Sequence, residues 1–161
     1  MEKIINNIRF CEIDGKLTAT RVASSAEYWA KRVAANPELI PNSQRTPEFW
    51  SQIVAKNLHL IEYVPVSLRT PEMCREVVAK EPYHIKYVPV SLRTPEMCRE
   101  VVAKNPHLIE YVPEPLRTPE MCREVVVKYP DLIKYVPEPL RTPEFWLDVL
   151  SINPKASKHF R

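Results

Sequence analysis

A 24-residue sequence repeat occurs four times in succession in this chain, and this repetition constrains the fold more than any other feature. Each copy begins with Arg-Thr-Pro-Glu, runs through an apolar stretch to Tyr-Val-Pro and closes on a leucine. A fixed period of this length is typical of a solenoid, in which each unit buries its apolar face only against its neighbours. The intact copies span 45–68, 69–92, 93–116 and 117–140, and divergent copies span 24–44 and 141–161.

The first half of each repeat carries the signals of a helix start. In the copy at 69–92, Thr70 is a good N-cap, Pro71 suits the first helical position, and Glu72 places an acid in the first turn. Pro82 then ends the helix near Lys80 or Glu81. The apolar residues between them fall on one helical stripe: Met73, Cys74, Val77 and Val78.

The second half predicts a shorter helix and a turn. In the next copy, Asn105 and Pro106 start a helix of one and a half turns that Pro113 stops. We expect Leu108, Ile109 and Val112 to face inward, and Glu114-Pro115-Leu116 to form a 3₁₀ turn anchored by the leucine. Because isolated helices shorter than about 12–15 residues are marginal in water, stability must come from stacking.

These signals predict an all-α fold, a six-repeat α-solenoid over 24–161, with residues 1–23 as an N-terminal cap. Asp14-Gly15 lies between two apolar runs, 8–13 and 17–22, and indicates a β-hairpin. Ile4, Ile8 and Cys11 also fit a helix that ends near Gly15, but we favour the hairpin.

Composition excludes few functions. The 161 residues carry 23 basic and 20 acidic side chains, and a net charge of +3 does not by itself favour nucleic acid or a membrane surface. The N-terminus has no apolar run of signal-peptide length, and no stretch is long enough to span a membrane. We expect a cytoplasmic monomer without membrane contact, although an effector delivered by an unconventional secretion route would have the same features.

Three of the four cysteines occupy one position in successive repeats: Cys74, Cys98 and Cys122. Stacked helices lie about 8–10 Å apart, which is too far for a disulfide. We therefore expect a ladder of reduced, buried thiols. A ladder also keeps ligands from converging, so we expect no metal site and no cofactor.

The repeat resembles a bacterial and viral tandem-repeat family that is still labelled a domain of unknown function. That family has a helix, a leucine-x-tyrosine-alanine block, and a closing leucine and arginine. The matching residues are Leu108 or Ile109, Tyr111, Val112 (valine where the family prefers alanine), Leu116 and Arg117.

The period and the phrase at residues 33–37, with Val33, Ala34, Asn36 and Pro37, are similar to the leucine-rich repeat variant. This second resemblance implies alternating α and 3₁₀ helices in a right-handed superhelix. Some members of that family carry an N-terminal iron–sulfur cluster, which is not carried over because Cys11 is the one cysteine in this N-terminal segment. Neither family supplies a catalytic residue.

Stacking turns each repeat position into a stripe. One stripe is basic: Arg45, Arg69, Arg93, Arg117 and Arg141. Another, three residues further on, is acidic: Glu48, Glu72, Glu96, Glu120 and Glu144. The favoured interpretation is a ladder of ion pairs between them. The alternative is that the arginines and the helix N-termini hold anions, such as the phosphates of a nucleic acid.

Aromatic residues form further rows. The tyrosines are expected to pack with their hydroxyls outward, or alternatively to anchor a partner: Tyr63, Tyr87, Tyr111 and Tyr135. Aromatic pairs replace Met-Cys in the outer copies, where they fill space or, alternatively, form a tryptophan pocket: Tyr28-Trp29, Phe49-Trp50 and Phe145-Trp146.

Positions that differ between near-identical copies carry the remaining information. The copies at 93–116 and 117–140 differ at four places: Ala103/Val127, Asn105/Tyr129, His107/Asp131 and Glu110/Lys134. The last position alternates in sign along the chain: Glu62, Lys86, Glu110 and Lys134. This variation either fixes the register of adjacent repeats, through pairing of opposite charges, or marks the face that meets a partner.

We therefore expect a non-catalytic protein-interaction scaffold whose partner is another protein. The partner-binding face would carry Asn105, Tyr129, His107 and Asp131 together with the tyrosine row. A nucleic-acid-binding solenoid that uses the arginine stripe is the alternative, and a purely structural spacer is another.

His84 stands at a leucine position and is expected to be a hydrogen-bonded core histidine. An enzyme is not expected, because the non-repeating polar residues make no recognised catalytic spacing: Cys11, Asp14, His84, Asp148 and His159.

Overall fold

The structure, a computed structural model, describes residues 3–5, 8–13, 16–21, 29–30, 33 and 45–159. The chain divides into two compact units, 1–68 and 69–161, and each is described here by itself. The boundary between them falls between Leu68 and Arg69, at a repeat boundary of the sequence. The expected boundary at residue 24 lies outside the described residues, as does most of the first divergent copy.

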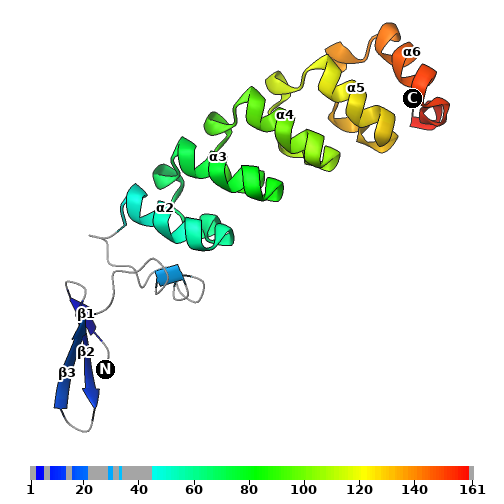
Figure 1. Cartoon of the computed structure of the whole chain (residues 1–161). Coiled ribbons are helices and arrows are strands. Elements are labelled where there is room, and N and C mark those ends of the chain that lie inside the picture. Colours follow the sequence, from blue (N-terminus) through cyan, green and yellow to red (C-terminus); the bar gives the residue numbers. More distant parts are fainter. Residues whose placement is uncertain are drawn as a thin grey trace. The chain divides into compact units, whose positions relative to one another are not determined.

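The N-terminal unit begins with a three-stranded antiparallel sheet in the order β1-β2-β3 (Figure 1). The strands are β1 (Lys3–Ile5), β2 (Ile8–Ile13) and β3 (Lys16–Arg21). In β2 and β3, Ile13 is paired with Lys16 and Ile8 with Arg21, so the predicted hairpin is confirmed. The predicted turn at Asp14-Gly15 lies outside the described residues. The additional strand β1 pairs with β2 and was not predicted.

The rest of the N-terminal unit contains one complete repeat: α2 (Pro47–Lys56), η3 (Leu58–Tyr63) and η4 (Val66–Leu68). Trp50 is buried in this repeat. Trp29, from the first divergent copy, is also buried and meets Phe49 edge to face with ring centroids 6.2 Å apart. Packing, the favoured interpretation of these outer aromatics, agrees with this burial.

The C-terminal unit contains four repeats, whose helices α3 to α6 lie side by side in sequence order (Figure 1). Each α-helix has ten residues: α3 (Pro71–Lys80), α4 (Pro95–Lys104), α5 (Pro119–Lys128) and α6 (Pro143–Ile152). Each is followed by a six-residue 3₁₀ helix: η5 (Pro82–Tyr87), η7 (Pro106–Tyr111), η9 (Pro130–Tyr135) and η11 (Pro154–His159). A three-residue 3₁₀ turn closes the first three of these repeats: η6 (Val90–Leu92), η8 (Glu114–Leu116) and η10 (Glu138–Leu140). The predicted all-α repeat solenoid is confirmed, while its right-handed twist stays a prediction.

The predicted helix starts are confirmed at every repeat of this unit. Thr94 is the N-cap of α4, and its Oγ1 accepts a hydrogen bond from the backbone N–H of Met97 at 3.2 Å. The same bond recurs in the other repeats, at 3.2–3.3 Å: Thr70 with Met73, Thr118 with Met121, and Thr142 with Phe145. Proline follows each cap, so the missing N–H costs no helical hydrogen bond.

In η5, η7 and η9 the second helix of the repeat is short and confined between two prolines, one at its first residue and one two residues past its end. In η7, Leu108 N–H donates to the Asn105 carbonyl at 3.0 Å, and Val112 N–H donates to the Ile109 carbonyl at 3.1 Å. These bonds span three residues, which is the 3₁₀ pattern. Leu108, Ile109 and Val112 are at most 1% exposed, so their predicted inward orientation is confirmed. Leu116, the expected anchor, is half-buried.

The core of the C-terminal unit is a repeated stack of small and medium apolar side chains. Cys74, Cys98 and Cys122 are free thiols with no exposed surface, as predicted. Burial raises the pKa of all three thiols, that of Cys122 to about 11, because a thiolate is poorly solvated there.

Candidate interaction surface

Arginines of the basic stripe join successive repeats by hydrogen bonds to main-chain carbonyl oxygens. Arg117 donates from Nε to the Val112 carbonyl at 2.9 Å and from Nη1 to the Tyr135 carbonyl at 2.6 Å. These two oxygens lie at the carboxyl ends of η7 and η9, which belong to consecutive repeats. Arg93 repeats the arrangement, with Nε donating to the Val88 carbonyl at 3.0 Å and Nη1 to the Tyr111 carbonyl.

The arginines at the two ends of the unit also bond to main-chain carbonyls. Arg141 donates from Nε to the Val136 carbonyl at 2.9 Å, and Arg69 donates from Nη1 to the Tyr87 carbonyl. Burial lowers the pKa of Arg69 and Arg93 because the guanidinium loses water. Helix-terminal carbonyls accept hydrogen bonds that no residue of their own helix supplies.

The favoured ion-pair ladder between the arginine and glutamate stripes is therefore wrong for this part of the chain. Within residues 69–159, no ion pair joins Arg93, Arg117 or Arg141 to the first-turn glutamates. The glutamates interact locally instead: a hydrogen bond from its own backbone N–H and one from the Thr118 hydroxyl lower the pKa of Glu120. The same causes lower the pKa of Glu96 and Glu144. The arginines are half-buried with their donors directed at carbonyls, which leaves little of them to hold phosphates.

The predicted tyrosine row is mainly a packing element. Tyr87, Tyr111 and Tyr135 are half-buried, whereas Tyr63, in the N-terminal unit, is 36% exposed. The Tyr135 hydroxyl donates to Glu110 at 3.2 Å, and the Lys134 Nζ lies 5.0 Å from the centroid of the Tyr135 ring.

The side chains that alternate in charge at one repeat position, Lys86, Glu110 and Lys134, do not form ion pairs with one another in the C-terminal unit. Lys86 Nζ lies 4.8 Å from the centroid of the Tyr87 ring, as Lys134 does over Tyr135. No ion pair between Lys86, Glu110 and Lys134 is present in the part of the chain at 69–159. These lysine–tyrosine contacts lie within one repeat, whereas the hydrogen bond from the Tyr135 hydroxyl to Glu110 joins two neighbouring repeats.

The variable residues meet one another across the boundaries between repeats. Asn105 Nδ2 donates to the Tyr83 hydroxyl at 2.6 Å. One repeat further on, the Tyr129 ring lies against the His107 ring, with centroids 4.7 Å apart. In both pairs the residue that precedes one short helix contacts the second residue of the short helix before it. We call the set Tyr83, Asn105, His107, Tyr129 and Asp131 the seam row.

The seam row is accessible to a partner. Tyr83 is 62% exposed and Tyr129 is 40% exposed, which are large fractions for aromatic side chains. His107 and Asp131 are exposed, and Asn105 is half-buried. The structure thus separates the predicted face into the accessible seam row and the largely buried tyrosine row.

Sequence analysis missed Tyr83. It occupies the repeat position of His107 and Asp131, so a comparison that included the copy at 69–92 would have revealed it.

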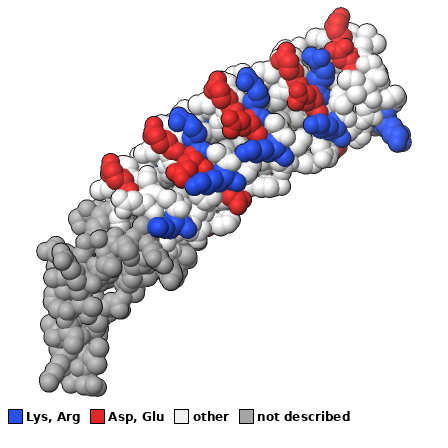
Figure 2. Space-filling model, in the orientation of Figure 1, with Lys and Arg blue, Asp and Glu red and all other residues white. Residues whose placement is uncertain are grey.

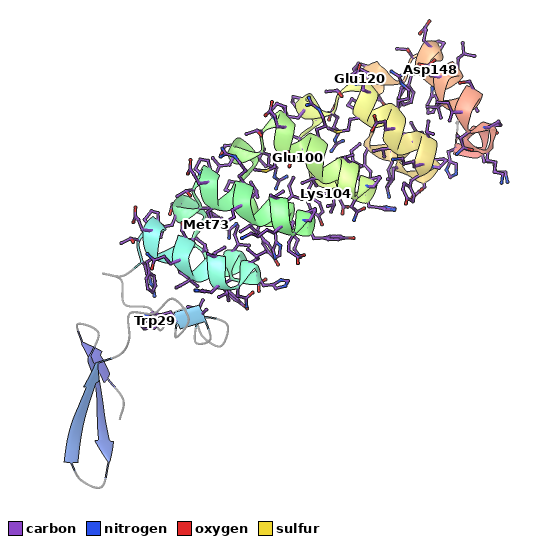
Figure 3. The ribbon with its side chains drawn as sticks, viewed as in Figure 1. Trp29, Met73, Glu100, Lys104, Glu120 and Asp148 are labelled. Carbon is purple, nitrogen blue, oxygen red and sulfur yellow. The ribbon has the colours of Figure 1, made fainter. Side chains whose placement is uncertain are left out.

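Acidic and basic side chains form rows across helices α3 to α6 (Figure 2). First-turn glutamates lie at the amino ends of the helices, and α3 to α5 carry lysines in their last turns: Lys80, Lys104 and Lys128. Figure 3 labels Lys104, whose Nζ donates to the Ala79 carbonyl of the preceding helix at 2.8 Å. Each row places charges where they complement the helix dipole.

The remaining candidates fit structural roles. His84 is 3% exposed, and its Nδ1 lies 3.3 Å from the Glu81 carbonyl oxygen, so it is the hydrogen-bonded core histidine that was predicted. Asp148, labelled in Figure 3, lies 3.5 Å from Arg123 of the preceding repeat, and His159 is exposed at the end of η11. Cys11 lies on β2, and Asp14 falls outside the described residues.

Neither a metal centre nor a membrane span is found in the part of the chain that the structure describes. No cluster of three or more histidine, cysteine, aspartate or glutamate residues there has the arrangement of a metal site. None of its helices combines the length and hydropathy that crossing a bilayer requires.

The fold and the surface define an all-α repeat protein with an accessible row of variable side chains. Comparison with protein-family models, with curated proteins and with solved structures finds no match to this chain.

Proposed function

We propose that this chain is a non-catalytic scaffold that binds another protein through the seam row. The observation that carries the proposal is the coincidence of variation and exposure. The 93–116 and 117–140 copies differ at four positions, and two of these, Asn105/Tyr129 and His107/Asp131, form this row. Core positions are identical in these copies.

The chemistry of the row suits protein recognition. Tyrosine combines a large apolar ring with a polar hydroxyl and is enriched among residues that dominate binding energy. The contacts between Tyr83 and Asn105 and between His107 and Tyr129 hold the rings in place before a partner arrives, which lowers the entropy cost of binding.

The same contacts support the alternative in which variation fixes the register of the repeats. The two roles make different demands on exposure, because a residue needed only for register has no reason to remain accessible. Tyr83 is bonded to Asn105 and yet is 62% exposed, and this supports the partner-binding role.

The nucleic-acid alternative draws less support. It relies on the arginine stripe, whose donors are directed at the carbonyls of Val88, Val112, Tyr111 and Tyr135.

We propose the cytoplasm as the location, because three buried thiols stay reduced there without further protection.

Partner capture from a native lysate, followed by mass spectrometry, tests the proposal. We expect Tyr83→Ala combined with Tyr129→Ala to lose the partners that the wild-type chain retains. Val90→Ala is the matched control, because Val90 is also 62% exposed but lies on η6, outside the seam row. Circular dichroism should show the same helix content in all three chains. Retention of every partner by the double variant would rule out this surface.

A further inference from the structure

An open hollow of about 430 Å³ lies where the closing turns of two neighbouring repeats of the C-terminal unit meet. Ligand pockets have volumes from about 300 Å³ upward, so the hollow has room for a side chain of a binding partner. Its lining comes from η8, from η10 and from the residues next to them: Glu114, Pro115, Arg117, Pro137, Pro139 and Leu140. None of these residues belongs to the seam row. We call this site the turn hollow.

The turns beside the turn hollow differ from those of the earlier repeats in a coordinated way. The first two intact copies carry Val-Ser at the start of the turn, at Val66-Ser67 and Val90-Ser91. The last two intact copies carry Glu-Pro there, at Glu114-Pro115 and Glu138-Pro139. The turn hollow lies between the two copies that share this exchange.

The exchange is not needed for the fold of the turn. The Val-Ser turn η6 and the Glu-Pro turn η8 are both 3₁₀ turns of three residues. Leu92 N–H donates to the Pro89 carbonyl at 2.9 Å in the first, and the equivalent bond from Leu116 N–H to the Pro113 carbonyl in the second is also 2.9 Å. Because both sequences give the same turn, the exchange changes the chemistry of the surface. A carboxylate replaces an apolar side chain, and a proline ring replaces a hydroxyl.

The lining combines apolar walls with one uncommitted charge. Three proline rings and Leu140 supply the walls. Arg117 is half-buried, and its Nε and Nη1 already donate to the carbonyls of Val112 and Tyr135. Glu114 is exposed, and no ion pair to it is present within residues 69–159. The charge that remains available to a ligand is therefore negative.

These features fit a side chain with an apolar stem and a cationic tip. Lysine and arginine both lay their stems along apolar surface and keep the charged head in water. Arginine suits this site better, because its planar guanidinium pairs with a carboxylate through two parallel hydrogen bonds. The proline rings are rigid, so the walls lose little conformational freedom when the site is filled.

We infer that the turn hollow binds an arginine side chain of a partner protein, with its stem against the proline rings and its guanidinium on Glu114. The turn hollow is a second contact point, separate from the seam row. The inference does not depend on the function proposed for that row, and each can fail without the other.

A titration of the isotope-labelled full chain with the capped tripeptide acetyl-Gly-Arg-Gly-amide tests the site by nuclear magnetic resonance. We expect saturable shifts of the backbone N–H signals of Glu114, Arg117 and Leu140. The dissociation constant should be on the order of 1–10 mM, because a single side chain makes the contact. Acetyl-Gly-Gln-Gly-amide has a polar tip without the charge and should give no saturable shifts over the same range.

Variants of the turn separate the charge from the fold. Glu114→Val combined with Pro115→Ser converts η8 to the sequence of η6, which this chain already folds, and should weaken binding of the arginine tripeptide by about fivefold or more. Glu114→Gln removes the charge alone and should weaken binding by about threefold or more. Glu124→Gln is the matched control, because it removes an exposed glutamate of α5 outside the turn hollow and should bind like wild type.

Three results would overturn the inference. The first is the absence of saturable shifts with the arginine tripeptide up to about 50 mM. The second is equal binding of the arginine and glutamine tripeptides. The third is equal affinity of Glu114→Gln and Glu124→Gln for the arginine tripeptide.

Discussion

Arg117 and Val112 are joined by a hydrogen bond of 2.9 Å from the arginine Nε to the valine carbonyl oxygen. The same guanidinium also reaches the Tyr135 carbonyl of the following short helix. One side chain thus satisfies the carboxyl ends of two consecutive 3₁₀ helices, which is why the residue recurs at the start of each repeat.

Arg117→Lys should destabilise the chain by about 1.5–3 kcal/mol, because an ammonium cannot keep both carbonyls in the geometry of the guanidinium fork. The free energy of unfolding in urea measures the loss. Arg99→Lys is the control, because Arg99 is exposed on α4 and should change stability by less than about 0.5 kcal/mol. Equal effects of the two variants would contradict the fastening role of Arg117.

Alkaline pH should weaken the fold through the cysteine ladder. The pKa of Cys122 is raised to about 11, whereas an unfolded thiol titrates near about 8.5. The native state therefore keeps its proton after the unfolded state has lost it. The contribution is complete below about pH 8.5 and is lost as the pH rises toward about 11.

Urea midpoints measured between pH 7.5 and 10.5 test this effect. Cys122→Ala should show a smaller decline than wild type over that range, although it starts from a lower stability because it leaves a cavity. Comparison of the two slopes removes the titration of tyrosines and lysines, which both chains share. Parallel slopes would show that the Cys122 thiol is not protected from ionisation.

The threonine cap of each α-helix should contribute measurably. Thr118→Ala removes the acceptor for the Met121 N–H and should cost about 1 kcal/mol in guanidinium unfolding. Ser91→Ala removes a hydroxyl from an exposed residue of η6 and should be nearly neutral.

The cap also predicts a dependence on acid. The pKa of Glu120 is lowered by hydrogen bonds from its backbone N–H and from Thr118. Its stabilisation is therefore complete above the ordinary glutamate pKa of about 4.3 and is lost as the pH falls through the lower native value. Between pH 5 and pH 3, Thr118→Ala should lose less stability than wild type. An equal loss would show that the Thr118 hydroxyl does not lower the pKa of Glu120.

His84 should be replaceable by the leucine that its position carries in three other repeats. His84→Leu is expected to raise stability by about 1 kcal/mol, because a buried imidazole gives up more hydration than its contact with the Glu81 carbonyl returns. The reciprocal change, Leu108→His, should lower stability by about 1–3 kcal/mol. Thermal melts of the two variants should move in opposite directions; if both fall, His84 has a further structural role.

The sequence was sufficient for the local structure of the repeats. Threonine caps, proline at the first helical position and the stop at the next proline are local signals, and they placed the end of α3 within one residue of Lys80, where it lies. The inward residues Leu108 and Ile109 followed from periodicity alone. The hairpin of β2 and β3 followed from Asp14-Gly15 between two apolar runs.

The sequence was not sufficient for contacts between repeats. The arginine stripe was assigned to the glutamates because side-chain charges are visible in a sequence, whereas the carbonyls of Val112 and Tyr135 are not. Their availability depends on where two 3₁₀ helices end relative to each other.

The use of carbonyl oxygens by Arg93 and Arg117 has an evolutionary consequence. A main-chain carbonyl is the same acceptor whichever amino acid supplies it. The arginine hydrogen bonds between repeats therefore tolerate substitution of almost every side chain around them. Duplication or deletion of a 24-residue segment at the gene level would create new neighbours that already fit. The length of such an array is then free to change.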